Sequence, residues 1–177
     1  MLTKTSKLRD IVTDNPELYS VLERMELLQS LDKNIEEAAI ANNIDSDFFM
    51  KTLNVLGRNG NPIQEEFSKF PLALILKYLQ KTHRYYLEKK LPEIEQSFLH
   101  LYLHYKDSHP LLVILSNFFI VYKNDLIAHI RNEEEQLFPY IKKMIEANEG
   151  KLQYSKLLPL MDQYCIKRFV SEHTDVE

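Results

Sequence analysis

A histidine and a glutamate stand four positions apart in the segment 128–139, whose sequence is AHIRNEEEQLFP. On a helix with 3.6 residues per turn, His129 and Glu133 project from one face about one turn apart, so both can reach the same metal ion. An imidazole and a carboxylate together suit iron, manganese or zinc. The chain contains 6 histidines, so chance also produces a spacing of this kind, and the surrounding sequence has to decide its meaning.

The other histidines allow two interpretations each. His83 is the polar member of an apolar helical stripe, where it is either a metal ligand or a core histidine hydrogen-bonded to a neighbour. His100 and His104 repeat the spacing of four, but no carboxylate shares their face, which favours a solvated helix surface over a second metal site. His109, before Pro110, is typical of a loop or helix cap.

Several further polar residues lie close to these histidines in the sequence. Glu134 and Glu135 point away from the face of Glu133, and the pattern predicts a solvated run of charge. Asp125, one turn before His129, is either an acceptor for an imidazole N–H or an exposed acid. Four tyrosines could either line a metal pocket or lie at the edge of the apolar core: Tyr85, Tyr86, Tyr122 and Tyr140.

The composition predicts an all-α protein. Only 3 of the 177 residues are glycine and 45% are hydrophobic, with many Leu, Ile, Lys and Glu. Apolar residues at helical spacing predict long helices over 71–90, from Pro92 to about 105, over 110–147 and over 152–170. Leu91-Pro92 should start or kink a helix, and Pro139 should bend or end one. Antiparallel helices of this length form an up-and-down bundle, in whose centre inward-facing His and Glu would meet.

The first part of the chain has a different pattern, with several short helices. Asn15 is a candidate cap before Pro16, either Asp32 or Asn34 can cap a second helix, and Asp45 can cap a third. The segment 57–62, GRNGNP, is the clearest helix breaker. We therefore predict a small helical domain over 1–57, a linker over 58–70 and the bundle over 71–177.

Charge and cysteine content exclude several classes of function. The net charge of -4 gives no basic face for nucleic acid. Cys165 is the only cysteine, which excludes an intrachain disulfide and indicates a reducing compartment. No apolar signal segment follows the N-terminus, and the apolar stretch 111–121 is too short to span a bilayer, so we predict a soluble cytoplasmic protein without membrane contact. No nucleophilic triad or phosphate-binding glycine loop is present.

Taken together, these segments carry a resemblance to a known family. His83 in ILKYLQKTHRYYLEKKLP, the segment DLIAHIRNEEEQLFP and then Glu172-His173 resemble the hemerythrin-like (HHE) cation-binding family, and most closely its di-iron proteins that repair iron-sulfur clusters. The form H-x-x-x-E-E-x-x-L-F-P is more specific than the bare spacing. The N-terminal part, from LRDIV through IEEAA to IDSDFF, is similar to the small helical domain that precedes the bundle in those repair proteins.

The resemblance implies a di-iron site in a four-helix bundle. His83, His129 and His173 would be terminal ligands, and the Glu133 carboxylate would bridge the metals. Imidazole and carboxylate donors leave open positions for a small molecule such as O2 or NO. The resemblance thus predicts iron as the cofactor.

Two departures from the family's pattern shape the functional prediction. The repair proteins carry a paired-cysteine motif where this chain has MELLQSLDK at 25–33. They also have a further helix with a second H-x-x-x-E pair, whereas this sequence ends at Glu177, whose spacing from His173 is four. We therefore expect a bundle whose last helix is either missing or supplied by a partner, and whose exposed apolar faces favour a homodimer.

Three functions follow as hypotheses. The first is a non-haem di-iron protein in nitrosative or oxidative stress, with a role in iron-sulfur cluster repair. The second is a metal-based sensor of O2, NO or iron in a larger regulatory protein. The third is a degenerate, metal-free helical interaction domain.

Overall fold

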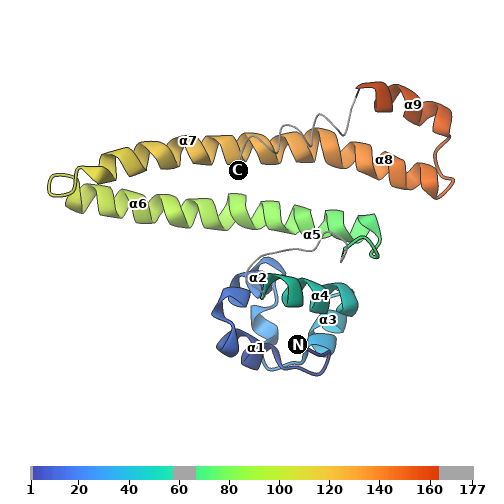
Figure 1. Ribbon diagram of the computed structural model, residues 1–177, viewed down its shortest axis with the longest axis horizontal. Coiled ribbons are helices and arrows are strands. Elements are labelled where there is room, and N and C mark those ends of the chain that lie inside the picture. Colours follow the sequence, from blue (N-terminus) through green and yellow to red (C-terminus); the bar gives the residue numbers. More distant parts are fainter. Residues whose placement is uncertain (1, 58–66, 164–177) are drawn as a thin grey trace. The chain divides into compact units, whose positions relative to one another are not determined.

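The computed structural model describes residues 2–57 and 67–163 (Figure 1). Within these ranges all regular elements are helical, apart from one isolated bridge between Lys7 and Asn34, which confirms the predicted all-α helical bundle class. The chain forms two compact units, Met1–Thr82 and His83–Glu177. Most of the predicted linker lies outside the described residues, so the domain limits at 57 and 71 stay a prediction.

The first unit consists of short helices that begin at local caps. Asn34 accepts a hydrogen bond from the backbone N–H of Glu37 at 2.8 Å, and the Glu37 carboxylate accepts one from the N–H of Asn34 at 3.1 Å. Asp45 caps the next helix by accepting from the N–H of Phe48 at 2.8 Å. The helices are α1 (Leu8–Asp14), η1 (Pro16–Leu18), α2 (Tyr19–Arg24), η2 (Leu28–Ser30), α3 (Ile35–Ala41), α4 (Ser46–Leu56) and the beginning of α5 (Leu72–Tyr85).

An apolar cluster fills the first unit. Phe49 and Leu53 on α4 are fully buried, together with Leu22 on α2. The ring of Phe48 meets those of Phe70 and Tyr78 edge to face, with centroids 5.3 and 5.8 Å apart. Because each fully buried large apolar side chain contributes about 1.5–3 kcal/mol, this cluster stabilises the unit.

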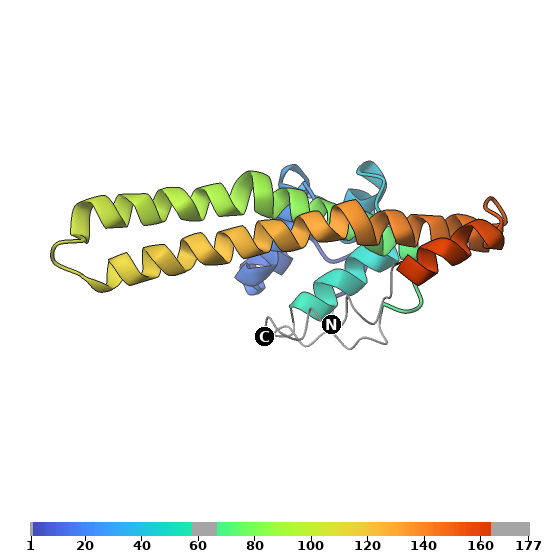
Figure 2. The same ribbon diagram turned by 90° about the horizontal axis from the view of Figure 1, so that it is seen from above.

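The second unit is built on a long antiparallel helical hairpin. Helices α6 and α7 lie side by side in both views (Figures 1 and 2). The rings of Phe98 and Phe119 stack across the hairpin at 4.9 Å, and Lys123 donates a hydrogen bond to Glu95. The elements after α5 are η4 (Tyr86–Lys90), α6 (Leu91–Tyr105), α7 (Leu111–Asn132), η5 (Glu133–Leu137), α8 (Phe138–Asn148) and α9 (Tyr154–Gln163).

Pro92, predicted to start or kink a helix, stands in the first turn of α6, and Pro139, predicted to bend or end one, stands in the first turn of α8. The segments η4 and η5 are π-helical turns, in which the N–H of Leu91 donates to the carbonyl of Tyr86 and the N–H of Phe138 to that of Glu133. Pro92 and Pro139 follow directly. Because proline has no N–H to donate, the regular hydrogen bond is lost and the helix widens before it continues.

The continuous helical segment Leu111–Asn148 is long and apolar enough to cross a membrane, judged by length and composition alone. It extends the stretch 111–121, which by itself is too short. A single helix of this kind is weak evidence for a membrane span, and the cytoplasmic location stays a prediction. Helix α9 covers the beginning of the predicted helix 152–170, whose remainder, with Cys165, lies outside the described residues.

Candidate metal centre

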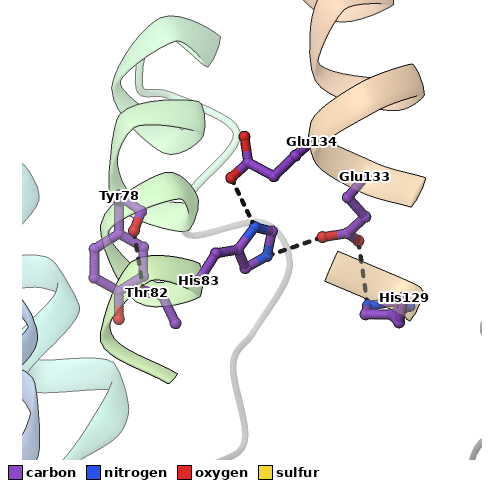
Figure 3. A network of polar contacts seen from close by, with 6 residues as sticks. All are labelled: Tyr78, Thr82, His83, His129, Glu133 and Glu134. Carbon is purple, nitrogen blue, oxygen red and sulfur yellow. Dashed lines mark hydrogen bonds and ion pairs between the residues drawn. The ribbon is translucent and has the colours of Figure 1, made fainter. Parts of the chain in front are cut away.

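His83 lies in the last turn of α5 and is almost completely buried, with 8% of its surface exposed. Its ring stacks on Phe138 at the start of α8, with centroids 5.3 Å apart and planes 3° from parallel. The hydroxyl of the preceding residue, Thr82, donates to the carbonyl of Tyr78 one turn earlier on α5, at 3.0 Å (Figure 3). The stacking on Phe138 holds the plane of the imidazole, so its two nitrogens point in fixed directions.

Two consecutive glutamates of η5 reach the two nitrogens of this ring (Figure 3). His83 Nε2 lies 3.0 Å from Glu133 Oε2, and His83 Nδ1 lies 3.0 Å from Glu134 Oε1. Burial lowers the pKa of His83, but the hydrogen bonds and negative charges of both glutamates outweigh it and raise the pKa. Ionised carboxylates accept hydrogen bonds, so each ring nitrogen is placed to donate one to its glutamate when it carries a proton.

Glu133 also contacts the second histidine that the sequence singled out. Its other oxygen, Oε1, lies 3.5 Å from His129 Nε2 (Figure 3). The Glu133 side chain is 13% exposed and that of His129 40%. The carboxylate therefore lies between two imidazoles and offers one oxygen to each.

This arrangement has the connectivity of a bridging carboxylate. Two donors held about 2.1 Å from one metal ion at an angle near 90–110° lie about 3.0–3.4 Å apart. The separations of 3.0 and 3.5 Å between Glu133 and the two imidazoles are close to this range. The same separations describe ion pairs, and in this structure Glu133 forms an ion pair with each of the two imidazoles.

The described residues alone supply few donors to each position. Within 2–57 and 67–163, no group of three or more His, Cys, Asp or Glu side chains is arranged so that it could hold one metal ion. Each imidazole meets a different oxygen of Glu133, which gives one nitrogen and one oxygen per position. The predicted ligand His173 lies outside the described residues, as does Glu177.

Glu134 is the polar residue that sequence reasoning missed. The prediction that it lies on a solvated surface is wrong, because its carboxylate contacts the buried ring of His83. The available signal was Pro139, since the π-helical turn before it alters the angular spacing of the side chains. Glu135 and Asp125 are exposed, as the simpler interpretation predicted.

The remaining candidates do not join His83, His129 and Glu133 in one group. His100 and His104 lie on the exposed surface of α6, and His109 follows that helix in a turn. Tyr140 belongs to the apolar cluster between α8 and α9. Tyr85 is buried, whereas Tyr86 and Tyr122 are 37% and 50% exposed.

Two known proteins are similar in sequence to this chain. Both are iron-sulfur cluster repair proteins. Each is named ScdA and comes from a strain of Staphylococcus epidermidis; each is 23% identical to this chain over 181 residues, which cover 99% of the chain and 75% of the relative. No family model matches the sequence, and no solved structure matches it. The similarity extends through both compact units and indicates a distant relationship to such repair proteins.

Proposed function

We propose that this chain is a hemerythrin-like, non-haem di-iron protein that acts in the response to nitrosative or oxidative stress, with iron-sulfur cluster repair as its role. The observation that carries the proposal is the Glu133 carboxylate between the Nε2 atoms of His83 and His129. The relationship to proteins named for iron-sulfur cluster repair supports iron as the metal. His173 would complete the set from outside the described residues.

The chain's own residues have separable tasks in this function. His83, His129 and Glu133 would hold the metal ions. The Glu134 carboxylate would keep the proton of His83 at Nδ1, which leaves Nε2 as the donor on the side of Glu133. Phe138 fixes the ring plane and covers one face of the imidazole against water. When bound, a pair of iron ions would supply open coordination positions for O2 or NO.

Exposed apolar residues support a homodimer as the working form. Four residues of α7 at helical spacing are among the most exposed apolar ones of the described chain: Leu111 at 71%, Ile114 at 65%, Phe118 at 68% and Val121 at 59%. Contiguous exposed apolar surface of this kind is typical of an interaction face. A second copy of the chain presents the same stripe, so the two can cover each other symmetrically.

The iron content of the protein tests the proposal. We expect about two irons per chain after purification from iron-replete cells, because a bridging carboxylate implies two metal positions. Glu133→Ala should lose most of this iron, and Glu135→Ala, which removes a neighbouring exposed carboxylate, should retain it. Elemental analysis of the three proteins gives the answer. Full retention of iron by Glu133→Ala would show that the ligands are misassigned.

A metal-free helical interaction domain is the alternative function. The exposed apolar stripe on α7 favours it. This alternative predicts that the wild-type protein contains no iron under the same iron-replete conditions. Iron in the wild type that is lost in Glu133→Ala would exclude it.

A further inference from the structure

The last turns of α6 bring two histidines together on the surface, away from Glu133. His100 and His104 are both exposed, and their ring centroids lie 4.3 Å apart with planes tilted by 35°. His104 Nδ1 lies 2.8 Å from the backbone carbonyl oxygen of His100. The spacing of four residues on a regular helix thus gives a compact pair of imidazoles.

The hydrogen bond to the carbonyl determines the tautomer of His104. A backbone carbonyl can only accept, so the proton of the neutral ring must lie on Nδ1. The Nε2 atom therefore keeps its lone pair. Metal-binding histidines usually donate their other N–H to a carbonyl or a carboxylate, which orients the ring and makes the free nitrogen a better donor. The carbonyl of His100 provides this support within the same helix.

We propose that His100 and His104 form a separate binding site for a divalent late first-row metal ion, of the class Zn2+, Ni2+ and Cu2+. Imidazole nitrogens suit these ions, and the affinity of such a site rises from Zn2+ and Ni2+ to Cu2+. The two rings supply two ligands, and water fills the remaining positions. The pair also lies at the carboxyl end of α6, where the helix dipole favours positive charge.

His109 provides a matched control for this site. It is an exposed histidine only a few residues further along, but it follows the end of α6. Its Nδ1 lies 2.9 Å from the hydroxyl of Ser108, and its ring contacts Tyr105 edge to face at 6.2 Å. Replacing it changes the number of histidines and leaves the pair on α6 intact.

Titration of the full chain with Zn2+ tests the proposal. The protein is first freed of metal with a chelator, and binding is followed by calorimetry and by NMR of the imidazole nitrogens at constant pH. We expect the resonances of His100 and His104 to shift together. His100→Asn and His104→Asn should each weaken this binding event by about tenfold or more, since a ligand is lost. Both side chains are exposed, so the variants should fold, and circular dichroism checks this.

His109→Asn and Glu133→Ala should both retain the event with unchanged affinity. Their retention would separate the site from the third histidine and from the candidate metal centre. The proposal is overturned if the wild type shows no shift of His100 and His104. It is also overturned if the event persists in both pair variants, or if His109→Asn abolishes it. Ni2+ in a parallel titration should bind more tightly than Mn2+.

Discussion

Both compact units bury apolar groups, but they differ in the polar groups that they bury: hydroxyls in the first and an imidazole in the second. Met1–Thr82 encloses an apolar cluster in which Leu22, Phe49 and Leu53 have no exposed surface. In His83–Glu177 the notable buried group is polar: His83 lies between two glutamates and against Phe138. Burial of apolar groups stabilises a fold by itself, whereas burial of a charged group stabilises it only when its partners are in place. The first unit therefore depends on its apolar cluster, and the second contains the candidate site, whose buried histidine depends on Glu133 and Glu134.

The second unit leaves many large apolar residues exposed. Large apolar residues on α6 and α7 remain exposed, among them Leu99 at 56%, Leu103 at 62% and Phe118 at 68%. The packing across this hairpin relies on few described contacts, such as Phe98 with Phe119 and Lys123 with Glu95. In a hairpin of two helices each helix packs against only one neighbour, so other apolar faces stay exposed to water, which is unfavourable.

The largest effect should come from a cavity in the apolar unit. We expect Phe49→Ala to lower the free energy of unfolding of Met1–Thr82 by about 3–5 kcal/mol, because a fully buried aromatic ring is removed. The iron content of the second unit should stay unchanged. Hydrogen exchange resolved by residue measures the two units separately. Equal loss of protection in both units would contradict this prediction and show that they unfold together.

A charge on the exposed stripe should have the next largest effect. Phe118→Glu should weaken self-association by about a hundredfold, or about 2.7 kcal/mol, because each copy of a symmetric dimer would bury an unpaired carboxylate. Asn117→Glu is the control, since it adds the same charge at an exposed neighbouring position. Sedimentation velocity over a range of concentrations measures the dimer. A protein that stays monomeric before substitution would refute the homodimer.

Removing the negative charge of the Glu134 carboxylate beside His83 should have a smaller effect, which we expect on the affinity for iron. Glu134→Gln should weaken iron binding about 10–100-fold, because the ring loses the charged partner that orients Nδ1–H. Glu135→Gln makes the same chemical change on the exposed side of η5 and should leave the affinity as it is. Competition with a chelator measures both affinities. Equal affinities for the two variants would remove Glu134 from the site.

The sequence predicted those parts of the site that depend on regular helical spacing. His129 and Glu133 are neighbours because four residues make about one turn, and His83 faces inward because it interrupts an apolar stripe. Glu134 was not predictable in this way, because η5 departs from the regular spacing. That its carboxylate meets the ring of His83 depends on how distant segments of the chain pack.

Features of the fold that depend on local sequence were predicted, whereas those that depend on packing between helices were not. The caps Asn34 and Asp45 bond to backbone groups three residues away, so local sequence determines them. Pro92 was expected to start or kink a helix and Pro139 to bend or end one; in both places a π-helical turn absorbs the lost hydrogen bond, and the next α-helix begins directly after it. Periodicity also marks the apolar stripe on α7, but what covers it depends on groups outside that helix.

The smallest effect expected is the loss of a helix cap in the first unit, where the sequence left two candidates open. Asn34→Ala should cost about 1 kcal/mol, because it removes the acceptor for the N–H of Glu37 and with it the reciprocal pair of bonds. Asp32→Ala should cost less, since Asp32 is 86% exposed and pairs with Arg9 on the surface. Urea unfolding followed by a probe in the first unit compares the two variants. A larger loss in Asp32→Ala would mean that the surface pair with Arg9, and not the cap, holds the start of α3.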